Sequence, residues 1–214
     1  MTDIIRTDPV RPSEEAIVAA ALVVKAGGLA VLPSDTVYGL VADLYSLEAI
    51  ERLYGLKERP AAKGLPVFIG DRSELDNLAA EIPEETSILM DLYWPGPLSI
   101  VLKKNPQVPD AVTGGRPTIA VRQPGYVVCQ GVLKEVGGPL TGTSANLTGG
   151  LAPRAVADLD PAIVEGVDII IDGGVCPYGV PSTILDVSGP VWRVLRQGPV
   201  TKEAIETAVG RVIK

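Results

Sequence analysis

Histidine is absent from the 214 residues of the chain. Because histidine is the commonest general base and a frequent zinc ligand, its absence excludes a Ser-His triad and most zinc sites. Cysteine is also scarce, and Cys129 and Cys176 lie far apart with no second cysteine near either. A CxxC redox or zinc motif is therefore excluded, and we expect both thiols to be reduced core residues.

The chain also has few aromatic residues and no long apolar run. Aromatics make up 4% of the chain against 46% hydrophobic residues, so the core must consist mainly of Val, Ile, Leu and Ala. No run approaches the roughly 18 apolar residues of a membrane span, and the N-terminus lacks the apolar segment of a signal peptide. These absences predict a cytoplasmic protein without membrane contact.

Basic residues are fewer than acidic ones. The chain has 19 Lys and Arg against 26 Asp and Glu, a net charge of −7. Binding to nucleic acid through its phosphates needs a basic surface, so this composition is unfavourable for non-specific nucleic-acid binding. No shift in composition marks a linker, and we expect one domain over residues 1–214.

Helical and strand patterns alternate along the chain and predict an α/β fold. Ser13 and Ser46 precede apolar residues at helical spacing, and each is expected to cap a helix. The expected strands cover 29–32, 65–69, 98–102, 118–122, 167–172, 182–187 and 191–195, and further helices begin at Ser73, Pro83, Tyr126 and Thr201.

The segment 56–66 has three cations in seven residues, between a helical pattern and an apolar strand pattern. If it is extended, Lys57 and Arg59 point to the same side and repel unless an anion lies between them. A guanidinium beside an ammonium suits a phosphate chain. The alternative is a solvated basic loop, which is the commonest fate of a charge cluster.

Other polar clusters follow the predicted strands. The stretch 33–40 has hydroxyls and a carboxylate after an apolar strand, where open α/β sheets bind ligands, although an ordinary turn is the alternative. The stretch 139–150 is rich in Gly, Ser and Thr, which suits either close approach to a ligand or a flexible loop. With Arg122 and Arg196 near strand ends, these clusters predict a cationic cleft for a small, multiply charged anion. The chain contains neither the P-loop pattern G-x-x-x-x-G-K-[ST] nor the Rossmann pattern G-x-G-x-x-G. A P-loop or a Rossmann dinucleotide site is therefore not supported.

Taken in order, these motifs resemble those of the YrdC family, the threonylcarbamoyl-AMP synthases. The matching segments are Pro33-Ser34-Asp35-Thr36-Val37-Tyr38-Gly39-Leu40, Lys57-Glu58-Arg59-Pro60, Trp94-Pro95-Gly96-Pro97-Leu98, Ala120-Val121-Arg122, Ser144-Ala145-Asn146 and Pro181-Ser182-Thr183-Ile184. The resemblance implies a twisted open mixed sheet with flanking helices and a concave basic cavity. It also implies the synthesis of threonylcarbamoyl-AMP and pyrophosphate from L-threonine, bicarbonate and ATP, the first step of the threonylcarbamoyladenosine modification of tRNA.

The same resemblance implies roles for individual residues. Lys57 and Arg59 would be catalytic. ATP would be bound by Arg59, Lys63, Thr118, Ser144, Asn146, Ala152 and Arg196, and threonine by Ser34, Thr36, Phe68, Arg122, Gly142 and Ser182, with Arg122 pairing the carboxylate. No metal site formed by protein side chains is expected, since the loops show no acidic cage, and Mg²⁺ would be carried by the ATP phosphates.

Ser34 stands where the family usually has Thr, and Gly64 stands where Pro is frequent. Phe68 stands where many members have a His near the amino acid, and it is expected to change the tightness of threonine binding. The implied partner is the threonylcarbamoyl transferase machinery that acts on tRNA, without direct tRNA binding by this chain. The two alternatives are an RNA-binding module of the same fold and a nucleotide-hydrolysing paralogue. The net charge of −7 opposes the first, and retention of Lys57-x-Arg59 with Ser144-x-Asn146 opposes the second.

Overall fold

The first two helices begin where the capping serines predict. In the computed structural model, which describes residues 2–214, α1 covers Glu14–Lys25 and α2 covers Leu47–Leu56. Ser13 Oγ accepts the Ala16 N–H, and Ser46 Oγ accepts the Ala49 N–H, each at 3.3 Å. Each serine therefore satisfies a backbone donor that the first helical turn leaves free.

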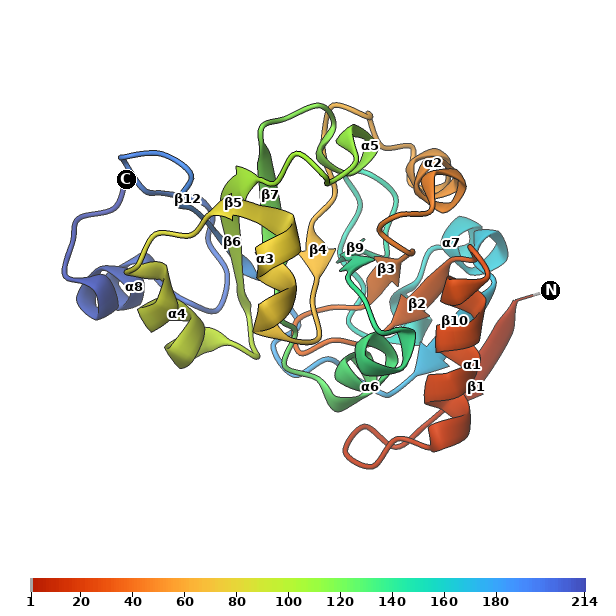
Figure 1. Cartoon of the computed structure of the whole chain (residues 1–214). Helices are drawn as coiled ribbons and strands as arrows, with labels where there is room; N and C mark the ends of the chain where they lie inside the picture. The colour runs from red at the N-terminus through yellow and green to blue at the C-terminus, as the bar shows by residue number, and fades with distance from the viewer. Residues whose placement is uncertain (1) are drawn as a thin grey trace.

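Five short strands form the smaller of two mixed sheets, in the order β1-β10-β2-β3-β9. Their bounds are Asp3–Arg6 for β1, Ile169–Asp172 for β10, Ala30–Leu32 for β2, Gly39–Val41 for β3 and Thr143–Ser144 for β9. Helix α1 packs against α6 (Val127–Val136), and both helices lie on one side of this sheet in Figure 1. The buried alanines of α1 and the apolar face of α6 form one hydrophobic cluster with this sheet.

The larger sheet has the order β12-β11-β6-β7-β4-β8, with β5 paired to β6. Its strands are Arg193–Arg196 (β12), Thr183–Asp186 (β11), Leu98–Lys104 (β6), Thr118–Arg122 (β7), Val67–Phe68 (β4), Leu140–Thr141 (β8) and Ala79–Glu81 (β5). The remaining helices are α3 (Leu75–Leu78), α4 (Thr86–Tyr93), α5 (Asp110–Thr113), α7 (Pro161–Gly166) and α8 (Lys202–Val209), with 3₁₀ turns at Arg72–Glu74 and Val156–Asp158.

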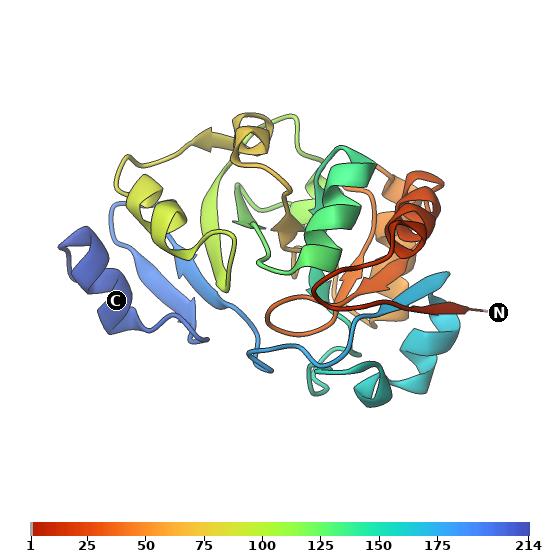
Figure 2. The same ribbon diagram turned by 90° about the horizontal axis from the view of Figure 1, so that it is seen from below.

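The two sheets adjoin in the middle of the molecule, where β3 contacts β8 and Asp43 forms a β-bridge with Leu140. Helices α4 and α8 pack together at the end that carries the C-terminus, and β1 lies at the other end near the N-terminus (Figure 2). Loops that link the two ends cross the middle of the molecule in both views. Residues from distant parts of the sequence therefore meet between the sheets.

The predicted class, a mixed α/β fold with flanking helices, is confirmed, but the described residues form two sheets instead of one. The chain passes from the larger sheet to the smaller at Gly142, between β8 and β9. A Cβ placed on Gly142 would lie 2.4 Å from the Phe68 ring. Only glycine allows the backbone this close to an aromatic ring, and this approach lets the chain change sheets here.

Several elements were not predicted because they are very short. Strands β8 and β9 have two residues each, and β3 has three, which is too few for an alternating pattern.

Cys129 and Cys176 are buried and free, as predicted. No helix in residues 2–214 is long and apolar enough to cross a membrane.

Candidate active site

Arg122 stands at the centre of the candidate site, at the end of β7. Parallel pairing with β4 places it beside Phe68, and its guanidinium lies 5.6 Å from the ring centroid. The side chain is 3% exposed. Its Nε donates to Gly96 O at 2.8 Å, Nη1 donates to Thr36 Oγ1 at 2.7 Å, and Nη2 bonds to Asp35 Oδ1. A guanidinium has five N–H groups, so two remain for a ligand.

The turn at 34–37 holds Arg122 in this orientation. Ser34 Oγ donates to Val37 O at 2.6 Å and lies 3.0 Å from Thr36 Oγ1. Asp35 Oδ1 also accepts the Gly125 N–H at 2.9 Å, while Asp35 Oδ2 is buried without a partner in residues 2–214. The carboxylate is thus already paired with Arg122, an interaction that the sequence reasoning did not include.

Burial lowers the pKa of Arg122, and the neighbouring Asp35 carboxylate opposes that shift. The guanidinium remains protonated at neutral pH, because arginine does not lose its proton in proteins. The pair is therefore a buried ion pair in which removal of either partner leaves an uncompensated charge. Its net charge is close to zero, so affinity for an anion needs further donors or cations.

Most of the predicted ligand residues line one cavity of about 160 Å³, which we call the Arg122 cavity. Its predicted members are Ser34, Thr36, Arg59, Phe68, Arg122, Gly142, Ser144, Ser182 and Arg196. These residues come from both sheets and from the loops between them. All of the residues expected to bind threonine are therefore brought together.

Ser182 and Arg196 form another part of the wall of the Arg122 cavity. Antiparallel pairing of β11 and β12 places Arg196 near Ser182, and Arg196 Nε donates to Ser182 O at 2.9 Å while Nη2 donates to Ser182 Oγ at 3.1 Å. Burial and then the charge of Arg122 lower the pKa of Arg196. Ser99, which also lines the cavity, has its Oγ 2.9 Å from Ser182 Oγ. Ser99 was not among the predicted site residues, because its only signal in the sequence is a lone hydroxyl in the apolar strand 98–102.

A second cavity of about 310 Å³, the Lys63 groove, contains the other predicted phosphate ligands. Arg59, Lys63 and Thr118 line it together with Arg116, and Arg59 also lines the Arg122 cavity. The Arg59 guanidinium donates from Nε to Lys63 O at 2.6 Å and from Nη2 to Gly64 O at 2.7 Å. Three of its five N–H groups therefore remain for a ligand.

Lys57 does not share a surface with Arg59, contrary to the extended geometry considered above. Lys57 ends α2 in a helical conformation, and Glu58 adopts a φ of 49°, so the segment is not extended. The ammonium of Lys57 is buried and donates to Ser144 O and, at 2.5 Å, to Asn146 O. It lines neither the Arg122 cavity nor the Lys63 groove. A catalytic role for Lys57 stays a prediction, and its observed contacts brace the 144–146 backbone.

Asn146 and Ala152 also lie outside the linings of both cavities. Asn146 Nδ2 donates to Leu147 O at 2.7 Å and Gly150 O at 2.8 Å, and its Oδ1 is buried with no partner in the described chain. These bonds hold the 146–150 turn. Contacts of Asn146 and Ala152 with ATP therefore stay predictions.

The chain is similar to known proteins in both sequence and fold. Residues 22–198 match the model of the Sua5/YciO/YrdC family, whose description is "Telomere recombination". Threonylcarbamoyl-AMP synthases of Pyrococcus abyssi and Bacillus subtilis are 36% and 35% identical to 94% and 96% of this chain. The chain spans 59% and 60% of the lengths of these two relatives. The crystal structure of P. abyssi Sua5 complexed with L-threonine matches 99% of this chain, which covers 62% of that chain, at 35% identity and a TM-score of 0.93. The chain therefore belongs to the Sua5/YciO/YrdC family.

Proposed function

We propose that the chain is an L-threonylcarbamoyladenylate synthase, a nucleotidyltransferase that uses L-threonine, bicarbonate and ATP. The observation that carries this proposal is that Arg59 lines both the hydroxyl-rich Arg122 cavity and the cationic Lys63 groove. A reaction that joins an amino acid to a nucleotide needs two adjoining sites of this kind. The named activity of the P. abyssi and B. subtilis relatives supports the same reading.

Threonine would occupy the Arg122 cavity. The two free N–H groups of Arg122 suit the α-carboxylate, which a guanidinium can bind through two parallel hydrogen bonds. Thr36 and Ser182 offer hydroxyls for the polar groups of the substrate, and the Phe68 ring offers an apolar surface for its methyl group. Arg196, which lines the same cavity, adds the positive charge that the Arg122–Asp35 pair lacks.

ATP would lie between the two cavities, with its phosphates toward Arg59, Lys63 and Thr118. The three free N–H groups of Arg59 suit phosphate oxygens near the junction. Ser144 and Arg196 line the Arg122 cavity and would contact the rest of the nucleotide, together with Asn146 and Ala152. This arrangement would bring the α-phosphate to the amino acid.

The chemistry requires positioning and charge neutralisation more than a strong base. The amine of threonine condenses with bicarbonate to give a carbamate and water. A carbamate oxygen then attacks the α-phosphorus, the new P–O bond forms, the bond to the β-phosphate breaks, and pyrophosphate leaves. Cations beside the phosphates stabilise the charge that develops on the leaving group, so a site without histidine can perform this reaction.

Residues 2–214 contain no cluster of three or more His, Cys, Asp or Glu that could hold a metal ion. We assign no step of the reaction to a metal ion held by protein side chains. We propose that Mg²⁺ arrives with ATP, held by its phosphate oxygens. The product would pass to the threonylcarbamoyl transferase machinery that acts on tRNA.

Amino-acid preference tests the proposal. Arg122 binds any α-carboxylate, so it cannot separate threonine from valine, which has nearly the same shape. A buried polar group left unpaired by valine costs roughly 1 to 3 kcal/mol, so we expect threonine to be preferred by roughly tenfold to a hundredfold. Serine should be intermediate because it keeps the hydroxyl and loses the methyl contact.

The measurement is pyrophosphate release from ATP and bicarbonate with each amino acid in turn. A reaction without amino acid supplies the background from ATP hydrolysis. Equal rates with threonine and valine would rule out a polar side-chain pocket. Pyrophosphate release that does not depend on any amino acid would remove the synthase proposal itself.

A further inference from the structure

Arg116 is a third cation of the Lys63 groove, outside every motif of the sequence analysis. It lines the groove together with Lys63, Arg59 and Thr118. Its side chain is exposed, and neither it nor the Lys63 side chain forms a hydrogen bond or ion pair within residues 2–214. Burial lowers the pKa of Arg59, and the positive charge of Arg116 adds to that shift. Both guanidinium groups line the groove, and their like charges disfavour each other there.

The loop that carries Arg116 is held against the basic segment 56–66 by backbone contacts. Gly114 follows α5 with a φ of 63°, and a Cβ there would lie 2.4 Å from Ala61 O. A Cβ on Gly64 would lie 2.6 Å from Thr113 O, and Leu65 N–H donates to Val112 O at 2.7 Å. Both glycines permit this close approach. These contacts place the loop that carries Arg116 beside the groove.

Arg59, Lys63 and Arg116 carry like charges that repel one another in this groove, and a bound anion would relieve that repulsion. The groove has one acidic lining residue, Asp186, and its Oδ1 already accepts the backbone N–H and the hydroxyl of Ser188. The remaining walls are largely apolar, with Val101, Ile119 and Leu195. This combination of cations without bonded counter-ions suits a linear oligophosphate.

We propose that Arg116 binds the terminal phosphates of ATP together with Lys63, and so holds the pyrophosphate that leaves. The assignment to ATP rests on the proposed function. Arg59 lines both cavities, so the α-phosphate belongs near it, where the carbamate would attack. Lys63 and Arg116 line only the groove, and the β- and γ-phosphates extend toward them.

The test is calorimetric titration of the whole chain with inorganic tripolyphosphate, ATP and AMP at one fixed ionic strength. Arg116→Ala should weaken tripolyphosphate and ATP binding about tenfold, because one charge-assisted contact is lost at an exposed site. AMP, which lacks the terminal phosphates, should bind as it does to the unsubstituted chain. Arg116→Lys keeps the charge without the planar fork and should be intermediate.

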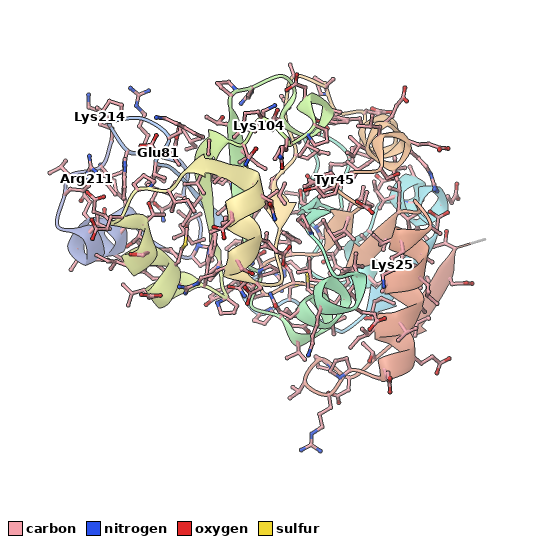
Figure 3. All side chains as sticks on the ribbon, in the orientation of Figure 1. Lys25, Tyr45, Glu81, Lys104, Arg211 and Lys214 are labelled. Atoms are coloured by element: carbon pink, nitrogen blue, oxygen red, sulfur yellow. The ribbon has the colours of Figure 1, made fainter. Side chains whose placement is uncertain are left out.

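Lys25→Ala is the matched control, because it removes the same charge from α1, away from α5 and its following loop (Figure 3). It should leave all three affinities unchanged. Tripolyphosphate binding by Arg116→Ala that equals that of the unsubstituted chain would overturn the inference, as would equal losses for AMP and tripolyphosphate. A third outcome separates the two proposals. If tripolyphosphate binding depends on Arg116 but the chain releases no pyrophosphate with threonine, the phosphate-binding role of Arg116 stands and the synthase proposal is removed.

Discussion

Lys57 carries an ammonium group inside the protein, where 2% of the residue is exposed. Burial lowers its pKa from 10.5 to about 8, and the charge of Arg59 adds to the shift. Between these two values the unfolded chain binds more protons at this residue than the folded chain. Because of Lys57, the free energy of unfolding should therefore increase as pH rises from about 8 to 10.5 and decrease as pH falls through the same range.

This prediction compares the unsubstituted chain with Lys57→Met, which removes the titrating group and keeps an unbranched side chain. Urea unfolding of both proteins across this pH range yields a difference curve in which the shared tyrosine and cysteine titrations cancel. The bonds to Ser144 and Asn146 are also lost in Lys57→Met, so the slope of the difference curve with pH, and not its height, reports the pKa shift. Two curves that stay parallel from pH 8 to 10.5 would show that the pKa of Lys57 is not lowered by folding.

At the scale of elements, the passage from β8 to β9 depends on Gly142 and the Phe68 ring beneath it. Gly142→Ala would place a methyl group 2.4 Å from that ring, so either the ring or the backbone must move. Overpacking of this kind costs about 1 to 3 kcal/mol of unfolding free energy. Phe68→Leu in the same chain should recover part of that loss, because the smaller side chain makes room.

Urea unfolding of the two single variants and the double variant measures this coupling as a double-mutant cycle. Gly138→Ala is the matched control, since a Cβ at Gly138 meets nothing within 4 Å. The interpretation fails if Gly142→Ala is as stable as Gly138→Ala. It also fails if the effects of the Gly142 and Phe68 substitutions simply add.

At the scale of the whole molecule, charge decides which partners are favourable. The net charge is −7, and three of the cations, Arg59, Lys63 and Arg116, line one groove. Short RNA should therefore bind weakly, with an affinity that falls steeply as salt increases, and ATP should displace it from the groove. Fluorescence anisotropy with a labelled oligonucleotide, with and without ATP, measures both effects. Tight binding that resists salt and persists with ATP would favour the RNA-binding alternative.

Local signals in the sequence predicted the long elements well. Ser13 and Ser46 cap their helices through bonds that span three residues, so a short stretch contains the whole signal. The short strands around the site were missed because β3, β8 and β9 are defined by their partners and not by their own residues. The residues grouped by their resemblance to the family gathered largely in the Arg122 cavity, while Lys57, Asn146 and Ala152 lie outside both linings.

By itself, the sequence determined the absence of histidine chemistry, the negative net charge and the order of the motifs, because these are properties of the chain without its fold. Only the tertiary structure decided how the motifs combine. The pairing of β4 with β7 puts Phe68 beside Arg122, and the Asp35 carboxylate takes one of the N–H groups of that arginine. Close approach at Gly64 and Gly114 brings Arg116 to the groove. Each of these contacts joins residues distant in sequence, so strand register and backbone packing specify it, and no local pattern does.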